Sequence, residues 1–375
     1  MFKVLRRLNL NPIFSNMNEK NTMCVFHAPD LDGWSSCAVA MEAGIAKEDC
    51  SNVWWWSYGD FDVDALAKRF EESGGESLDY ILTGDISLTE SAVFDFNLYG
   101  IKVVTTDHHI SAIRKYASRK CDGSDSVYVS SAEDDANLAA VNEVFWVGRD
   151  DCESKPFKKH SYNYAFFPKE GEIISGALLL WLAINGQKGK SIPEFLEYVS
   201  AWDAWDLQSK WRDGSILLNA AMVSRMDRTC LKMDRIEART MLVQNDLLDM
   251  LKHPTVVYEA IKEGKIIQEH NEGQWAKTAR NAYTIQWEGC RLLCLNGRGP
   301  SLMAKTVYNP DQHEGIVLWS INKEGKVSVS FYNEHVTDSS PDFSEIAKKY
   351  GGGGHKGAAG CVMSKIPSEF LTPVE

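Results

Sequence analysis

Short apolar runs alternate with helix-like segments along the first third of the chain. The runs at residues 23–27, 52–58, 80–82 and 101–105 predict strands, and apolar residues recur at helical spacing between them, as in residues 34–41 and 65–72. Strands that alternate with helices predict a mostly parallel sheet with helices on both faces. Ligands of such sheets bind at the carboxyl ends of the strands.

The pattern is less regular in the middle of the chain. Residues 111–170 contain acidic and Ser-rich pieces, and we expect loops or an insertion there. Helices are predicted again at residues 175–183 and 193–205. The chain is then polar and helix-prone over residues 207–282, which is typical of a connector between domains.

Alternating apolar and polar positions return from residue 283 onward. Runs such as CRLLCLN and KVSVSFYN, separated by Gly or Asn, predict β-strands, and residues 343–350 predict a helix. A length of 375 residues exceeds one ordinary core. We predict an α/β fold. The chain is expected to divide into an N-terminal extension (1–20), a parallel-sheet domain with helices on both faces (21–206), a helical linker (207–282) and a smaller α/β domain (283–375).

Charge and cysteine content narrow the class of protein. The formal charge of −12 argues against binding of long nucleic acid, because such binding relies on Lys and Arg. Nine cysteines without a CxxC pair indicate reduced thiols and a cytoplasmic protein. No apolar run is long enough to span a membrane. The basic start has only a broken apolar run, which excludes a secretory signal but leaves an amphipathic targeting segment as an alternative.

Carboxylates and imidazoles gather where the predicted strands end. Their negative charge requires neutralisation, and divalent ions provide it well. Oxygen ligands with a minority of imidazoles favour Mn²⁺ or Mg²⁺ over structural zinc. Alone, these motifs also fit a solvated turn, a helix cap or, for TTDHH, core histidines. The candidate residues are His27, Asp30 and Asp32 (HAPDLDG), Asp85 (TGDIS), Asp107, His108 and His109 (TTDHH), and Asp203 (SAWDAWD).

Two local geometries are expected around these motifs. In an extended loop, Asp30 and Asp32 project to the same side, so each faces one of two adjacent ions, and Gly33 lets the backbone turn directly afterwards. The distal GGGGHKGAAG offers bare backbone N–H groups and a helix start, which suit phosphate. A flexible glycine hinge is the alternative reading of that segment.

These motifs, in this order, resemble those of the DHH–DHHA1 phosphoesterase superfamily over roughly residues 22–365. The resemblance implies a DHH catalytic domain with two Mn²⁺ ions, or Mg²⁺ or Co²⁺, and a DHHA1 domain that holds substrate. Two residues separate His27 from Asp30, where many members have three. Ser328 and Ser330 stand where some members have an Arg-Ser pattern. The spacing resembles that of the short-oligonucleotide and cyclic-nucleotide phosphodiesterases of the nanoRNase type.

The resemblance also implies a role for each residue. His27, Asp30 and Asp85 would bind one ion. Asp32, Asp85, His108 and Asp203 would bind the other, with Asp85 bridging. Asp107 would orient His108 or a water, and His109 would contact the scissile phosphate. The terminal phosphate or nucleotide would lie in a cradle formed by Gly352, Gly353, Gly354 and His355.

The expected function is hydrolysis of phosphodiesters in short oligonucleotides or in cyclic or linear dinucleotides by hydroxide that two metal ions activate. A phosphomonoesterase acting on 3′-phosphoadenosine 5′-phosphate, or a pyrophosphatase, would use the same ions. A nucleotide-binding protein without catalysis is a further alternative. The expected partner is thus a small nucleotide or a short oligonucleotide, binding to a membrane or a long duplex is not expected, and a homodimer is left open.

Overall fold

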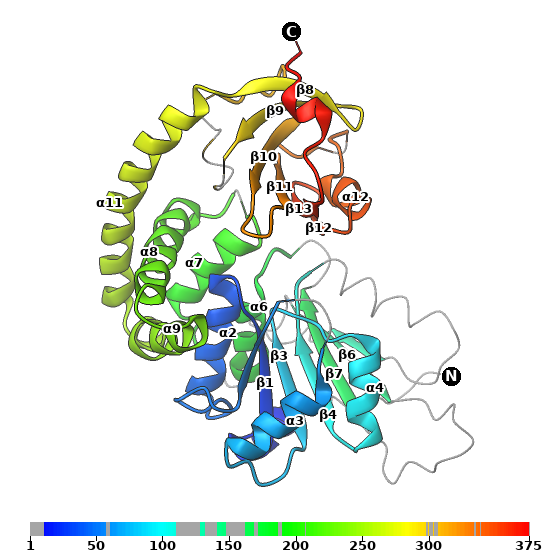
Figure 1. The fold of residues 1–375 in the computed structure, drawn as a ribbon. Helices are drawn as coiled ribbons and strands as arrows, with labels where there is room; N and C mark the ends of the chain where they lie inside the picture. The colour runs from blue at the N-terminus through cyan, green and yellow to red at the C-terminus, as the bar shows by residue number, and fades with distance from the viewer. Residues whose placement is uncertain are drawn as a thin grey trace, which may run out of the picture. The chain divides into compact units, whose positions relative to one another are not determined.

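A computed structural model describes most of the chain (Figure 1). Two compact units are present, Met1–Lys265 and Ile266–Glu375. The domain boundaries expected from the sequence stay predictions. The described residues are 11–57, 61–109, 128–131, 141–147, 162–168, 172–186, 190–206, 208–297, 299, 303, 307–333, 335–337 and 339–374.

A seven-stranded sheet forms the centre of the first unit (Figure 1). Its strand order is β2-β1-β3-β4-β7-β6-β5. The five strands from β2 to β7 in this order are parallel. Strand β6 pairs antiparallel with β7, and β5 pairs antiparallel with β6. The strands are β1 (Thr22–His27), β2 (Val53–Trp56), β3 (Tyr80–Gly84), β4 (Lys102–Thr106), β5 (Tyr128–Ser131), β6 (Val141–Val147) and β7 (Tyr162–Pro168).

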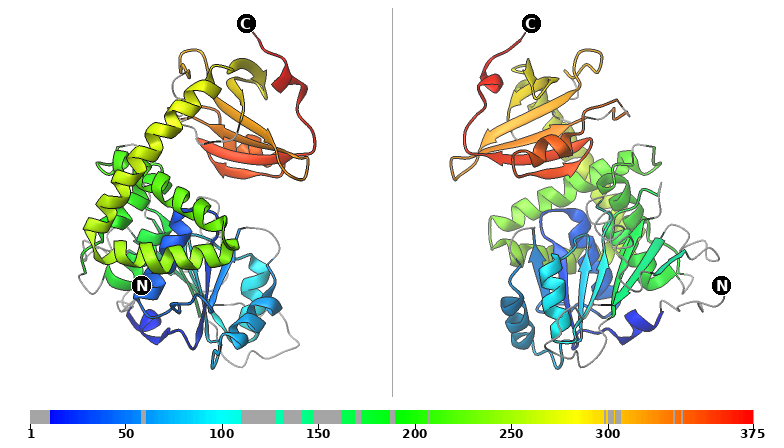
Figure 2. Two further views of the ribbon diagram at one scale, coloured as in Figure 1. Left: turned by 60° about the vertical axis from the view of Figure 1, so that its left-hand side comes forward. Right: turned by 90° about the vertical axis from the view of Figure 1, so that its right-hand side faces the viewer.

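Helices cover both faces of this sheet, as the sequence predicts (Figure 2). Successive residues of a strand point to opposite faces. Cys24 and Phe26 therefore join the core beneath helices α2 (Leu31–Glu42) and α6 (Gly176–Asn185), whereas Met23 and Val25 join the core beneath α3 (Val63–Glu72) and α4 (Glu90–Leu98). On the first face Phe14, in the short helix α1 (Asn11–Asn16), packs against Phe166 with ring centroids 5.6 Å apart.

Residues 207–282, predicted as a helical connector between domains, are largely helical in the part that the structure describes. Most of them belong to the first unit. Leu218, Val243 and Val257 are buried in the core that α2 and α6 share. A region that buries apolar side chains in this way extends the core and is more than a free connector. The helices are α7 (Glu194–Asp203), α8 (Arg212–Cys230), α9 (Arg235–Leu242), the π-helical η2 (Val243–Leu247), α10 (Leu248–Lys252) and α11 (Pro254–Ala279).

The second unit contains a mixed sheet with strand order β12-β13-β11-β10-β9-β8. Strands β9 and β10 are parallel and the other neighbours are antiparallel. Trp287, Phe331 and Phe343 pack in its core beside α12. The elements are β8 (Tyr283–Trp287), β9 (Cys290–Asn296), β10 (Gly315–Ile321), β11 (Val327–Tyr332), α12 (Phe343–Lys348), β12 (Gly353–His355), β13 (Ala358–Met363) and the 3-10 helix η4 (Ser368–Leu371).

Three local expectations were wrong. The supposed loops of residues 111–170 contribute strands β5, β6 and β7, although much of that stretch lies outside the described residues. The HAPDLDG motif is an extended loop only up to Asp30, because α2 begins at Leu31. The GGGGHKGAAG segment starts no helix and forms the hairpin of β12 and β13.

The described residues were also expected to lack membrane-spanning helices and to keep their cysteines reduced. None of their helices is long and apolar enough to span a membrane. The seven cysteines within the described part of the chain are all free thiols, six of them buried.

Candidate metal centre

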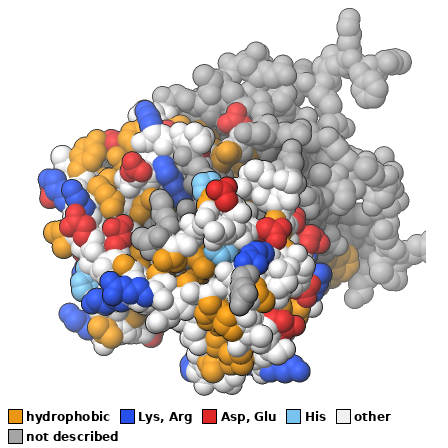
Figure 3. Space-filling model, turned by 90° about the horizontal axis from the view of Figure 1, so that it is seen from above, with side chains coloured by type: hydrophobic (Ala, Val, Ile, Leu, Met, Phe, Trp, Pro, Cys, Tyr) orange, Lys and Arg blue, Asp and Glu red, His pale blue; other side chains and the backbone are white. Residues whose placement is uncertain are grey.

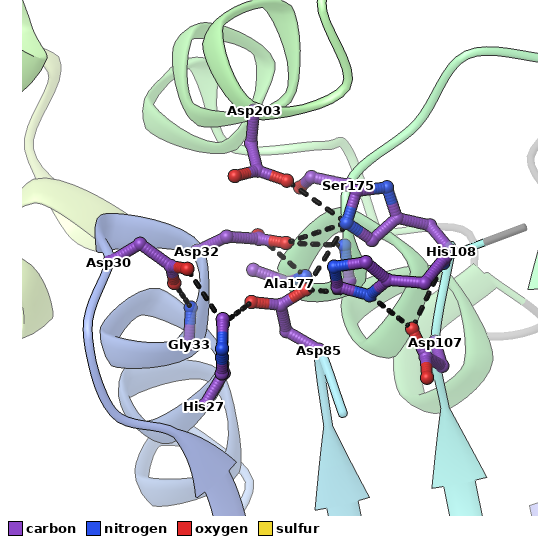
Figure 4. Close-up of polar contacts among 12 residues, drawn as sticks. His27, Asp30, Asp32, Gly33, Asp85, Asp107, His108, Ser175, Ala177 and Asp203 are labelled. Carbon is purple, nitrogen blue, oxygen red and sulfur yellow. Dashed lines mark hydrogen bonds and ion pairs between the residues drawn. The ribbon is translucent and has the colours of Figure 1, made fainter. Parts of the chain in front are cut away.

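Three parallel strands deliver the candidate residues to one edge of the first sheet. Phe26 of β1 pairs with Gly84 of β3, and Gly84 pairs with Thr106 of β4. The next residues along these strands, His27, Asp85 and Asp107, therefore follow neighbouring positions at the carboxyl edge (Figure 4). Residues from distant parts of the sequence meet there because the strands are parallel.

The first group of donors comes from β1, the start of α2 and the end of β3. His27 Nδ1 lies 2.6 Å from Asp30 Oδ2 and 3.2 Å from Asp85 Oδ2 (Figure 4). Asp30 is the N-cap of α2, and its side chain accepts a hydrogen bond from the backbone N–H of Gly33 at 3.1 Å. His27, Asp30 and Asp85 offer ligand atoms that all lie within 4.8 Å of one another.

The second group shares Asp85 with the first. His108 Nε2 lies 3.0 Å from Asp203 Oδ2, 3.2 Å from Asp85 Oδ1 and 3.8 Å from Asp32 Oδ2. Ligand atoms of Asp32, Asp85, His108 and Asp203 all lie within 4.8 Å of one another. The two oxygens of Asp85 thus face different groups, as a carboxylate that bridges two ions would.

Asp32 lies in the first turn of α2, where an extended loop was expected, and the start of a second helix fixes it. The backbone N–H groups of Gly176 and Ala177, at the start of α6, donate to its two carboxylate oxygens at 2.6 and 2.9 Å. A helix N-terminus is a favourable place for a carboxylate. These two amides were not predicted from the sequence, although Ser175 before an apolar run is a recognisable N-cap.

Close backbone approaches explain two glycines of the centre. A Cβ on Gly33 would lie 2.0 Å from the carbonyl oxygen of His27, so its small size lets α2 approach β1; the sharp turn expected there is absent. A Cβ on Gly176 would lie 2.6 Å from Cα of Asp85. Asp85 itself has a left-handed backbone, with φ of 59°, that residues other than glycine rarely adopt.

Asp107 and His109 form a further pair at the centre, and His109 Nδ1 also lies 3.9 Å from Asp85 Oδ1, in a third group of possible donors with His108. His109 Nδ1 lies 2.7 Å from Asp107 Oδ1, and the His109 backbone N–H donates to the same oxygen at 3.0 Å. Ser87, which the sequence analysis also missed, donates its hydroxyl to Asp107 Oδ2 at 2.5 Å. Asp107 is therefore placed to orient His109, where the sequence reading had it orient His108 or a water.

Two carboxyl groups of the centre, those of Asp32 and Asp85, are costly to ionise as they stand. Burial, followed by the charges of Asp85 and Asp203, raises the pKa of Asp32 well above its usual range. Burial also raises the pKa of Asp85, and the charge of Asp30 adds to that effect. Divalent cations stabilise ionised carboxylates in such surroundings.

The pKa values of two imidazoles are raised as well, and for these groups a raised pKa favours the charged form. Burial lowers the pKa of His27, but its hydrogen bonds to Asp30 and Asp85 outweigh burial and raise the pKa to about 10. Asp203 and Asp85 likewise outweigh burial and raise the pKa of His108 well above its usual range. The imidazolium charges thus partly compensate the carboxylates. With oxygen and imidazole donors and no thiolate, both groups fit a pair of divalent ions.

The four candidate substrate residues lie in the other unit, at the β12–β13 hairpin. A Cβ on Gly352 would lie 2.0 Å from the Gly360 carbonyl oxygen, and one on Gly354 2.5 Å from that of Ala358. Gly354 also has a φ of 140°. Gly353 has nothing within 4 Å of its Cβ position, and the backbone of His355 pairs with Ala358. The hairpin itself therefore explains Gly352 and Gly354 but leaves Gly353 without a structural requirement.

The second unit is recognisable by its sequence. Residues 301–371 match the family model of the DHHA1 domain. The chain therefore contains a DHHA1 domain, which confirms the resemblance to the DHH–DHHA1 superfamily. No curated protein matches the chain.

Three solved structures are similar to the chain at low sequence identity. The pGpG-specific phosphodiesterase PggH of Vibrio cholerae is 13% identical, with 92% of this chain and 94% of that one covered and a TM-score of 0.43. The exonuclease RecJ bound to manganese is 14% identical (99% and 94% covered, TM-score 0.42). An exopolyphosphatase-related protein of Bacteroides fragilis is 13% identical (99% and 95% covered, TM-score 0.42). Similarity at this level does not identify an activity for this chain.

Proposed function

We propose that the protein is a divalent-metal-dependent phosphodiesterase that hydrolyses short oligonucleotides or cyclic or linear dinucleotides. The observation that carries the proposal is the pair of donor groups that share Asp85. Two bound ions at such a site supply an activated water and neutralise charge on the phosphoryl oxygens. The donor chemistry suits Mn²⁺ first, with Mg²⁺ or Co²⁺ as alternatives.

The side chains around the ions have separable tasks in this proposal. Asp85 fixes the spacing of the two groups, and the amides of α6 hold Asp32 in one orientation. Burial lowers the pKa of His109, but the bond to Asp107 outweighs burial and raises it. A protonated, oriented imidazole is a suitable donor to a phosphate oxygen on which charge develops.

Charge supports a short substrate. The chain has a formal charge of −12, which disfavours a long polyanion. On the face drawn in Figure 3, acidic and basic side chains of the described residues are interspersed with hydrophobic ones, and no broad basic area is visible. Local recognition by the metal centre suits a small nucleotide better.

The decisive experiment is a substrate screen with the purified full-length protein and Mn²⁺. We expect release of mononucleotides from short RNA or DNA, or from cyclic or linear dinucleotides. Asp85→Asn should abolish turnover, whereas Asp79→Asn, at an exposed carboxylate that accepts from Ser77, should not. Preferential hydrolysis of 3′-phosphoadenosine 5′-phosphate or pyrophosphate would favour the alternative activities. Nucleotide binding without turnover would leave only a binding protein.

The glycine hairpin can be tested separately through Gly353. Because its Cβ position is open, Gly353→Ala should fold with unchanged stability. If the backbone there approaches a phosphate closely, KM should rise about tenfold or more with kcat little changed, since a ligand contact of this kind is worth roughly 1.4 kcal/mol or more. A wild-type KM in this variant would remove Gly353 from the substrate site.

A further inference from the structure

Helix α7 ends at Asp203, which places a candidate metal ligand at the negative end of a helix. The last carbonyl groups of a helix have no partner within it, and together they carry a partial negative charge. Both effects place negative charge close to the Asp203 side chain. The backbone N–H groups of Ala204 and Trp205 bond to the carbonyls of Ser200 and Trp202, and a cation at this end would compensate the charge that remains.

Arg212, the first residue of α8, supplies this cation. Its Nη1 donates to the carbonyl oxygen of Ala201 at 3.0 Å and to that of Trp202 at 3.3 Å. Its guanidinium carbon lies 5.2 Å from the centroid of the Trp202 ring and 4.8 Å from that of Trp205. One side chain thus caps the carbonyls and contacts the indoles on either side of Asp203.

The chain reverses directly after Asp203 through a strained residue. Trp205 has a φ of 58°, in the left-handed region that residues other than glycine rarely adopt. Its ring is one of the two that Arg212 contacts. The guanidinium group therefore helps to hold the turn that ends α7.

The backbone that carries Arg212 is itself firmly placed. The rings of Tyr198 in α7 and Trp211 pack edge to face with centroids 4.9 Å apart. A Cβ on Gly214 would lie 2.4 Å from Cε1 of Tyr198, which shows how closely α8 approaches α7. The packing of α8 against α7 therefore fixes the backbone from which the Arg212 side chain extends to the end of α7.

Asp203 depends on such support more than the other carboxylates of its group. Its side chain is 21% exposed, whereas those of Asp32 and Asp85 are 0% and 1% exposed. Backbone amides hold Asp32, and the strand edge holds Asp85. Asp203 Oδ2 reaches His108 Nε2, at 3.0 Å, from a helix end (Figure 4).

We propose that Arg212 is a positioning residue that holds Asp203 in the second group of donors, so that this ion site depends on Arg212 and the first does not. The inference rests on the proposed metal centre. It assigns to Arg212 a role in metal binding without contact with the metal, through the end of α7 and the two tryptophans.

The test is Mn²⁺ binding, measured by calorimetric titration of the full chain and by the spin-coupled electron paramagnetic resonance signal of an ion pair. Wild type should bind two ions. Arg212→Met should weaken the second ion at least tenfold, leave the first within about twofold, and lose the coupled signal. Asp203→Asn should show the same pattern. Arg212→Lys keeps the charge and should recover part of the affinity.

Arg228→Met is the matched control, because Arg228 lies on the same helix and pairs with Glu263, away from α7. It should bind both ions as wild type does. Two wild-type affinities in a folded Arg212→Met protein would overturn the inference while leaving the metal centre intact. Equal loss of both ions in Arg212→Lys would also overturn it. A wild-type protein that binds no Mn²⁺ would instead overturn the proposed function.

Discussion

Replacement of Asp85 by Asn should separate metal binding from folding in the first unit. Asn keeps the size of the side chain and tolerates the left-handed backbone at this position better than most residues do. It removes the one carboxylate that both donor groups share. Each group therefore loses a charged ligand through a single substitution.

The expected size of the effect follows from binding linkage. At a free Mn²⁺ concentration a hundredfold above its dissociation constant, each bound ion stabilises the native state by about 2.7 kcal/mol, so two ions contribute roughly 5 kcal/mol. In a unit of this size about 1 kcal/mol shifts Tm by roughly 2–4 °C, so Mn²⁺ should raise Tm by roughly 10–20 °C. In Asp85→Asn the rise should shrink to below about 5 °C.

Differential scanning calorimetry with and without Mn²⁺ measures this difference. The second unit contains none of the donors of either group, so its transition supplies an internal reference. The unfolding temperature in a chelator gives the baseline for each protein. An equal Mn²⁺-induced shift in wild type and Asp85→Asn would refute the assignment of Asp85 as the shared ligand.

Three further changes test the centre and the fold. His109→Asn should lower kcat by about a hundredfold or more, because the substitution removes a hydrogen-bond donor to the phosphate. The Mn²⁺ stoichiometry in calorimetric titration should stay at two. Loss of an ion in this variant would show that His109 is a metal ligand instead. Gly33→Ala should destabilise the protein by about 2–3 kcal/mol in urea unfolding, because the added Cβ meets the carbonyl of His27, whereas Gly273→Ala, in open space on α11, should be neutral or stabilising. Burial holds the pKa of His313 below its usual 6.5, so protonation favours the unfolded chain. The free energy of unfolding of the second unit should therefore be highest above about pH 7 and fall as the pH drops through 6.5. In urea titrations at several pH values, His313→Gln should remove that fall.

The strand ends were predictable because local signals determine them. The short strands that lead to His27, Asp85 and Asp107 carry apolar or β-branched residues, and a local pattern of this kind predicts a buried strand without distant information. Parallel order then brings their ends together. The donor residues of both groups could therefore be named from sequence before their distances were known.

The start of α2 was misplaced although a local signal existed. Asp30 caps the helix and Asp32 lies in its first turn, a pattern of acidic residues that is typical of helix starts. Interpreting both as loop residues grouped them with the other candidate donors, but for an incorrect geometric reason. In the structure Asp30 and Asp32 face different groups of donors.

Other parts of the site could not be predicted because distant contacts create them. The amides of Gly176 and Ala177 are more than 140 residues from Asp32, and no local pattern links them. Strands β6 and β5 join the parallel sheet through β7, from a stretch whose acidic and Ser-rich pieces we interpreted as loops. Asp107 depends on this extension, since its backbone N–H donates to the Phe166 carbonyl of β7 at 3.2 Å.

The backbone of Asp85 has a consequence for the descent of such proteins. A buried carboxylate on a left-handed residue is a combination that folding alone would not select, since glycine at this position would relieve strain of about 1–2 kcal/mol. In a lineage without selection for metal binding, substitution of this residue by Gly or Asn would not lower the stability of the fold. The residue found there is thus a marker that separates relatives under selection for the metal centre from those that retain only the fold.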